Sequence, residues 1–173
     1  DIPVVFMGAA LDDADLSYVS VDDLEGGFRA TEYLINAGHR LIACLYPPHV
    51  FAGQDRFRGY VNALNAYGLA QDERLVKTIS TFYTNETPAQ TIFLMKELLA
   101  LGSERPTAVF CFNDLIAAQS YKAIKEARLR VPDDISLIGF DDSEMAIQLP
   151  VSLTSMIHPK YYLGKWLSSE QHE

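Results

Sequence analysis

Six side chains suited to binding a small polar ring follow short apolar segments of the chain. They are Arg56, Phe82, Tyr83, Asn113, Asp141 and His158. A guanidinium, an amide and a carboxylate form paired hydrogen bonds with neighbouring hydroxyl groups, and an aromatic side chain packs against the C–H face of a sugar. This combination of residue types therefore favours the binding of a sugar or of a molecule with similar chemistry.

Most of these residues also have an ordinary structural explanation. Arg56 could form an ion pair on the surface, where such pairs contribute little. Asn113 and the adjacent Asp114 could cap the helix that follows them, and for Asp114 we predict capping rather than ligand contact. Asp141 and Asp142 could form a simple turn, and the two aromatic residues could pack within their own loop.

The segments that must position these residues alternate between short apolar runs and longer runs of helical periodicity. We expect strands at residues 2–7, 41–45, 75–79, 107–112, 135–140 and 153–156, and helices at 22–38, 54–66, 87–101 and 114–127. The strands are apolar throughout, so both faces of their sheet must be covered, as in parallel α/β sheets. Parallel strands place their carboxyl ends at one edge, where such sheets bind ligands.

Local signals add detail to these elements. The buried face of the first helix is expected to carry Leu24, Phe28, Thr31, Leu34 and Ile35. Thr87, followed by Pro88, is expected to cap the third helix. We expect His39 to be a structural turn residue, and Tyr161 and Tyr162 to be packing residues.

Composition excludes several classes of function. The chain has 173 residues and a net charge of −9, so it lacks the basic face that nucleic acid or an anionic membrane requires. Cys44 and Cys111 lie in apolar runs and are expected to be reduced core thiols of a cytoplasmic protein. The sequence has no zinc-ligand spacing, phosphate loop or hydrolase motif, so we expect no cofactor and no metal.

Four segments in a fixed order carry a family resemblance that covers nearly the whole chain. They are 21–27 with 34–40, then 55–60, then 111–114, and finally 131–142 with 153–155. Together they resemble the effector-binding domain of the LacI/GalR family of bacterial repressors. The segment around Asp22 and Gly26, together with His158-Pro159-Lys160, is more similar to the arabinose-operon repressor subgroup than to the lactose or purine repressors.

The resemblance implies an α/β, periplasmic-binding-protein-like fold with two Rossmann-like lobes and parallel sheets. The first lobe would be incomplete in this chain: residues 1–38 would form part of it, 39–150 the ligand-binding second lobe, and 151–173 a hinge crossing back. It implies sugar or purine contacts at Arg56, Asn113 and Asp141, an aromatic contact from Phe82 or Tyr83, and a contact from His158 at the hinge. Gly8 departs from relatives that carry Asp or Asn after the first strand, so a first-lobe contact would be missing or supplied elsewhere.

The resemblance therefore predicts a non-enzymatic, sugar-sensing domain of a cytoplasmic repressor. Its effector would be arabinose or another monosaccharide, and it would act as a homodimer that contacts operator DNA through a separate head outside this chain. Two other functions are possible from the residues. One is a periplasmic sugar-binding protein of a transporter, and the other is a Mg²⁺-dependent phosphoryl-transfer domain using Asp141, Asp142 and Lys160.

Overall fold

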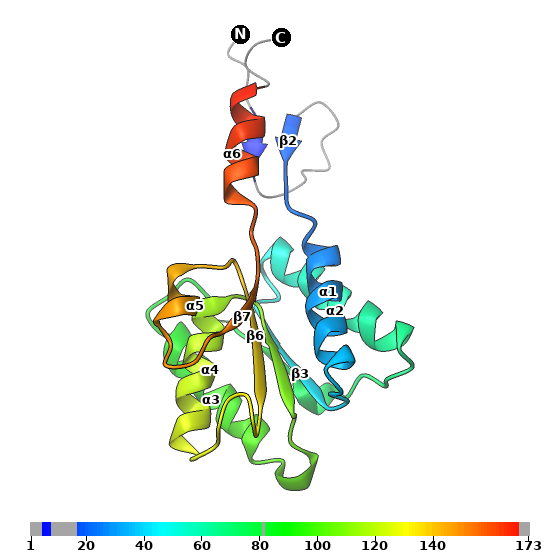
Figure 1. The fold of residues 1–173 in the computed structure, drawn as a ribbon, viewed down its shortest axis with the longest axis vertical. Helices are drawn as coiled ribbons and strands as arrows, with labels where there is room; N and C mark the ends of the chain where they lie inside the picture. The colour runs from blue at the N-terminus through cyan, green and yellow to red at the C-terminus, as the bar shows by residue number, and fades with distance from the viewer. Residues whose placement is uncertain (1–4, 8–16, 81, 170–173) are drawn as a thin grey trace. The chain divides into compact units, whose positions relative to one another are not determined.

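The computed structural model describes residues 5–7, 17–80 and 82–169 (Figure 1). The chain divides into two compact units, one formed by Asp1–Asp22 with His158–Glu173 and the other by Asp23–Ile157. The lobe boundaries expected at 38 and 150 stay predictions. In the present division, residues 23–38 lie with the larger unit.

The larger unit is built on a five-stranded parallel sheet in the order β4-β3-β5-β6-β7. Its strands are β3 (Ile42–Tyr46), β4 (Val76–Thr78), β5 (Ala108–Cys111), β6 (Ser136–Phe140) and β7 (Thr154–Met156). Each lies within a few residues of a strand expected from the sequence. All four neighbouring pairs are parallel, which confirms the predicted α/β class.

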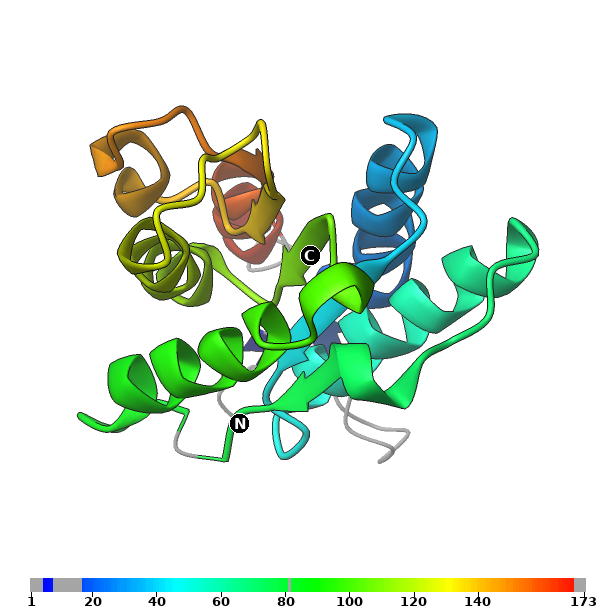
Figure 2. The same cartoon turned by 90° about the horizontal axis from the view of Figure 1, so that it is seen from below.

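Helices cover both faces of this sheet, which explains why its strands are apolar on every side (Figures 1 and 2). Helices α1 (Asp23–Asn36) and α2 (Phe51–Ala66) pack on one face, and α3 (Thr87–Leu99) and α4 (Asp114–Glu126) pack on the other. Strand β3 shows the alternation: Ile42 and Cys44 face α1 and α2, whereas Ala43 and Leu45 face α3 and α4. Both cysteines are buried and unpaired, as expected for core thiols.

Two glycines let α1 and α2 approach closely. A Cβ atom at Gly27 would overlap the carbonyl oxygen of Arg56, and one at Gly59 would overlap that of Leu24. The buried stripe of α1 runs through Asp23, Gly27, Ala30, Thr31, Leu34 and Ile35. Leu24 lies at the edge of this stripe and is 37% exposed, so its predicted place on the buried face is wrong.

Several local predictions are corrected. Helix α2 begins at Phe51 rather than near residue 54, and Thr87 lies inside α3, where Glu86 precedes the first turn without a side-chain cap. Thr87 Oγ1 instead accepts a hydrogen bond from Thr84 N. The short helix α5 (Glu144–Gln148) and the 3₁₀ turns η1 (Glu73–Leu75) and η2 (Gly102–Glu104) were not expected.

The smaller unit contains β1 (Val5–Met7) and β2 (Ser17–Val19), which pair in parallel with Val5 opposite Ser17. Helix α6 (Lys160–Ser169), also not expected, belongs to this unit and contacts β2. Tyr161 and Tyr162 of this helix are exposed, although their rings meet edge-on, so the prediction that they are packing residues is wrong. Gly8, noted above as a departure, lies outside the described residues.

His39 joins three elements at the amino ends of the strands, which confirms its structural role. Its Nδ1 lies 2.9 Å from Thr107 Oγ1 and its Nε2 lies 3.0 Å from Ser136 Oγ. Burial lowers the pKa of His39 below its ordinary value of 6.5. The folded state therefore favours the neutral ring more strongly than the unfolded chain does.

The lowered pKa of His39 predicts a loss of stability in mild acid. The contribution of the neutral His39 ring to the free energy of unfolding is fully present above pH 6.5. It is lost as the pH falls through the pKa of the folded state, because the unfolded chain binds the proton more readily. Urea unfolding between about pH 7.5 and pH 5.5 should show a shallower decline for His39→Gln than for the parent. Ser136→Ala keeps the imidazole and should keep the parent's decline. An unchanged decline in His39→Gln would contradict this prediction.

Candidate functional site

The loops after β4, β5 and β6, together with α2, carry five of the six predicted site residues within the larger unit. Arg56 lies in the second turn of α2, Phe82 and Tyr83 follow β4, Asn113 follows β5, and Asp141 directly follows β6. The carboxyl edge of the parallel sheet therefore carries most of the predicted site residues, which is where such sheets bind ligands.

Arg56 is the most constrained member of this set. It is 4% exposed, its Nε donates to Asp23 Oδ1 at 2.7 Å, and its Nη1 donates to the carbonyl oxygen of Phe112 at 2.6 Å. Its guanidinium carbon lies 3.5 Å from the ring centroid of Phe140 and 4.5 Å from that of Phe112. The alternative of a weak surface ion pair is therefore wrong, since the Arg56–Asp23 pair is buried between aromatic rings.

Asp141 lies beside Arg56 but is more accessible. Its Oδ1 is 3.6 Å from Arg56 Nη1, and about 30% of its side chain is exposed. The backbone of Asp141 has φ 96°, and that of Asp142 has φ 43°. These left-handed conformations turn the chain sharply at the end of β6, with Asp141 N donating to Met156 O of β7 at 2.9 Å.

Asn113, rather than Asp114, caps helix α4. The Asn113 side-chain oxygen accepts a hydrogen bond from Ile116 N at 3.1 Å, and its backbone is extended, as an N-cap requires. The prediction that Asp114 is the cap is therefore wrong. Its carboxylate instead accepts bonds from Ser143 and Ser155. Asn113 remains half-buried at the sheet edge, and the bond that caps the helix uses its Oδ1 rather than its amide nitrogen.

The two aromatic candidates differ in exposure. Phe82 is buried, and its ring meets that of Phe112 edge-on with centroids 5.0 Å apart. Tyr83 is 85% exposed with φ 65°, and its ring lies over Phe82 at a centroid distance of 4.1 Å. Of the two, Tyr83 is the ring that a ligand can reach.

His158 belongs to the smaller unit. Its Nδ1 is shielded from solvent and has no hydrogen-bond partner among the described residues. A buried nitrogen of this kind is costly unless a further group satisfies it.

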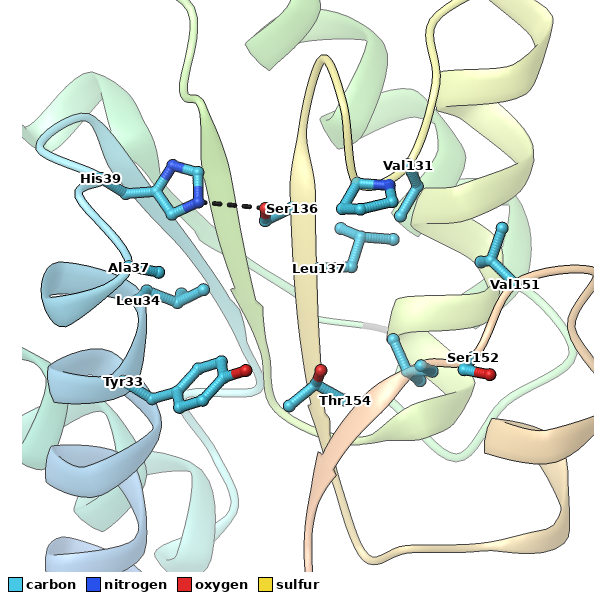
Figure 3. Close-up of a pocket in the computed structure, with 12 residues that line it drawn as sticks. Tyr33, Leu34, Ala37, His39, Val131, Ser136, Leu137, Val151, Ser152 and Thr154 are labelled. Carbon is cyan, nitrogen blue, oxygen red and sulfur yellow. Dashed lines mark hydrogen bonds between the residues drawn. The ribbon is translucent and has the colours of Figure 1, made fainter.

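A cavity of about 230 Å³ lies at the other end of the sheet, near the amino ends of β6 and β7 (Figure 3). It is lined by side chains that include Tyr33, His39, Ser136 and Thr154. None of the six predicted site residues lines it, and both ring nitrogens of His39 already have partners. This cavity is therefore separate from the candidate site.

Some functional neighbours were not recognised in the sequence. Asp23, Phe112 and Phe140 form the surroundings of Arg56, and none of them was among the predicted site residues. Within the described ranges 5–7, 17–80 and 82–169, no group of three or more His, Cys, Asp or Glu side chains could hold a metal ion. No helix in the same ranges is long and apolar enough to cross a membrane.

Comparison with known proteins identifies the family. The periplasmic binding protein-like domain matches residues 31–166. The chain belongs to this family. The arabinose metabolism transcriptional repressor of Geobacillus stearothermophilus is 37% identical over 166 residues, covering 94% of this chain and 44% of the repressor.

Solved structures agree with this membership of the periplasmic binding protein-like family. A LacI-family regulatory protein from Chloroflexus aggregans is 32% identical with a TM-score of 0.86, over 95% of this chain and 57% of that one. A complex of the transcriptional regulator CelR with cellobiose is 32% identical with a TM-score of 0.84, over 96% and 50%. The resemblance to LacI-family effector domains is thus confirmed, and the chain spans about half the length of these relatives.

Removing Asp23 from its buried pair with Arg56 is expected to lower the stability of this periplasmic binding protein-like domain strongly. Asp23→Ala leaves a buried guanidinium without its carboxylate and should lower the free energy of unfolding by about 3 kcal/mol. Asp55→Ala removes the carboxylate of the exposed Asp55–Arg58 pair on the same helix and should cost less than about 1 kcal/mol. Urea denaturation of both variants tests this difference, and equal losses would show that burial of the pair is unimportant.

Proposed function

We propose that this chain is the effector-sensing part of a bacterial transcriptional repressor and that it binds a sugar at the carboxyl edge of its larger sheet. The observation that carries the proposal is the pairing of a fixed guanidinium, Arg56, with the partly exposed carboxylate of Asp141 at 3.6 Å. A rigid cation beside an accessible anion offers both donors and acceptors to neighbouring hydroxyl groups.

Two further residues of the larger unit contribute to the proposed site. The amide of Asn113 supplies a second donor, and the exposed ring of Tyr83 supplies an apolar face for a pyranose or furanose ring. We keep His158, in the smaller unit, as a separate candidate for ligand contact, because its buried Nδ1 has no partner among the described residues. Phe82 supports Tyr83 from below rather than contacting the ligand.

The relatives guide the choice of effector. One is named as an arabinose repressor, and one solved regulator holds cellobiose. We therefore place L-arabinose first among the candidates, ahead of other monosaccharides, cellobiose and purines. These relatives are regulators, which supports a binding role rather than a catalytic one.

The proposed partners follow from the same assignment. The repressor would act as a cytoplasmic homodimer, and its operator contacts would come from a DNA-binding head separate from this chain, since a net charge of −9 disfavours contact with DNA phosphates. Ligand binding would favour one conformation of the dimer and so change the affinity of the two heads for DNA.

The alternative functions find less support. Phosphoryl transfer would need Asp141 to hold Mg²⁺, yet its carboxylate lies beside the Arg56 guanidinium, which competes for the same oxygen atoms. A transport protein would share the fold and the sugar chemistry. Operator binding by the full-length protein, measured by mobility shift with and without L-arabinose, separates a repressor from a transport protein.

The proposed site predicts a sugar-dependent gain in thermal stability. L-arabinose at a hundredfold excess over its Kd should stabilise the full-length protein by about 2.7 kcal/mol and raise its Tm by several degrees. Asp141→Asn keeps a residue that tolerates positive φ but removes the charge, so it should weaken binding by at least about tenfold. Asp133→Asn changes the same charge at an exposed pair with Arg130 and should bind like the parent. Unchanged affinity in Asp141→Asn would remove this residue from the site.

A further inference from the structure

Asp114 is a buried carboxylate whose partners all lie on other elements. It is 1% exposed, and the ion pairs of the described residues do not include it. Its Oδ2 accepts from Ser143 N at 2.7 Å and from Ser143 Oγ at 2.8 Å, and its Oδ1 accepts from Ser155 Oγ at 2.6 Å. Since the N-cap of α4 is Asn113, these bonds require an explanation other than helix capping.

The bonds of Asp114 converge on the turn that carries Asp141. The hydroxyl of Ser155, which donates to Asp114, accepts from Asp142 N at 3.1 Å. Three consecutive amides after β6 are thus held from outside the turn. Asp141 N is held by Met156 O, Asp142 N by Ser155 Oγ, and Ser143 N by Asp114 Oδ2. Asp114 contributes to two of the three, one directly and one through Ser155.

This turn needs such support because of its backbone. Asp141 and Asp142 both have positive φ, and neither is glycine. Side chains disfavour this region, and residues held in it persist only where the surroundings fix them. We therefore expect these external hydrogen bonds to keep the turn, and with it the carboxylate of Asp141, in place beside Arg56.

The sheet also leaves room for the Asp114 carboxylate. Gly139 lies in β6, and a Cβ atom there would overlap Asp114 Oδ1. Even alanine at this central strand position would displace the carboxylate that binds Ser155. Strand β6 therefore lacks a side chain at the point where Asp114 reaches the turn.

We propose that Asp114 is a positioning residue which, through Ser143 and Ser155, holds the Asp141 carboxylate in place for ligand binding. This inference rests on the proposed function for its ligand, whereas the part concerning the turn does not depend on any ligand. Asp114 touches neither Arg56 nor Asp141 through the hydrogen bonds described above, so its effect on affinity must be indirect.

The first test uses the ligand-free, full-length protein. Hydrogen–deuterium exchange, resolved by residue through electron-transfer fragmentation, should show roughly tenfold faster exchange at Asp142 and Ser143 in Asp114→Asn than in the parent. The amides of β6 should be unchanged. Ser155→Ala gives the same test at Asp142 if Asp114→Asn does not fold. Unchanged exchange at these amides in the folded variants would overturn the proposal.

The second test separates positioning from general destabilisation. The Kd for L-arabinose should rise by about fivefold in Asp114→Asn, and by less than about twofold when the same change is made in Asp141→Asn, because the residue being positioned has already lost its charge. Tyr60→Phe removes a buried hydrogen bond to Ile42 O and should lower Tm without changing Kd. An equal rise in both backgrounds would assign Asp114 a merely structural role.

A negative result can be assigned either to the proposed effector or to the positioning role of Asp114. If the parent does not bind L-arabinose, the effector assignment fails, while the exchange measurement alone still decides whether Asp114 holds the turn. If the parent binds L-arabinose but the two backgrounds respond equally, the sensing function stands and the positioning role is overturned.

Discussion

Burial of the Arg56 guanidinium is the constraint on which the carboxyl edge of the larger unit depends. Removing a cation from water is costly, and the cost is offset only where a carboxylate, further acceptors and polarisable rings are already in place. Asp23, the carbonyl oxygen of Phe112 and the ring of Phe140 provide these partners. Because they come from α1, the end of β5 and the end of β6, the three elements must meet at Arg56.

That meeting depends on how closely α1 and α2 pack. The carboxylate of Asp23 reaches Arg56 Nε only because Gly27 and Gly59 bring the two helix backbones together, with no side chain between them. On the opposite face of the sheet, Gly139 plays a comparable part by admitting Asp114. Both buried carboxylates therefore depend on glycines at fixed positions. Asp23 bonds directly to Arg56 of the candidate site, whereas Asp114 bonds to the serines that hold the turn carrying Asp141.

The sequence predicts the elements well because their signals are local. Continuous apolar runs and helical periodicity identified every strand of the larger sheet and its four long helices. The start of α2 was missed because Val50, which precedes it, makes no side-chain cap bond that a pattern could signal. The burial of Arg56 could not be predicted, since its carboxylate partner lies 33 residues away and only the tertiary structure joins them. Likewise, Asn113 and Asp114 are adjacent residues of similar capping tendency, and only the location of Ser143 and Ser155 separates their roles.

The rigidity of Arg56 and of the Asp141 turn has a consequence for the proposed sensing function. Arg56 and the Asp141 turn are held by hydrogen bonds within the larger unit, so a ligand need not order them on binding. A ligand that touched only these groups would bind every conformation of the protein equally and would shift no equilibrium. A sensing role would therefore require contacts outside this rigid set that form in one conformation and are lost in another. The larger unit would then supply affinity and selectivity, and the response would depend on groups that only one conformation brings to the ligand.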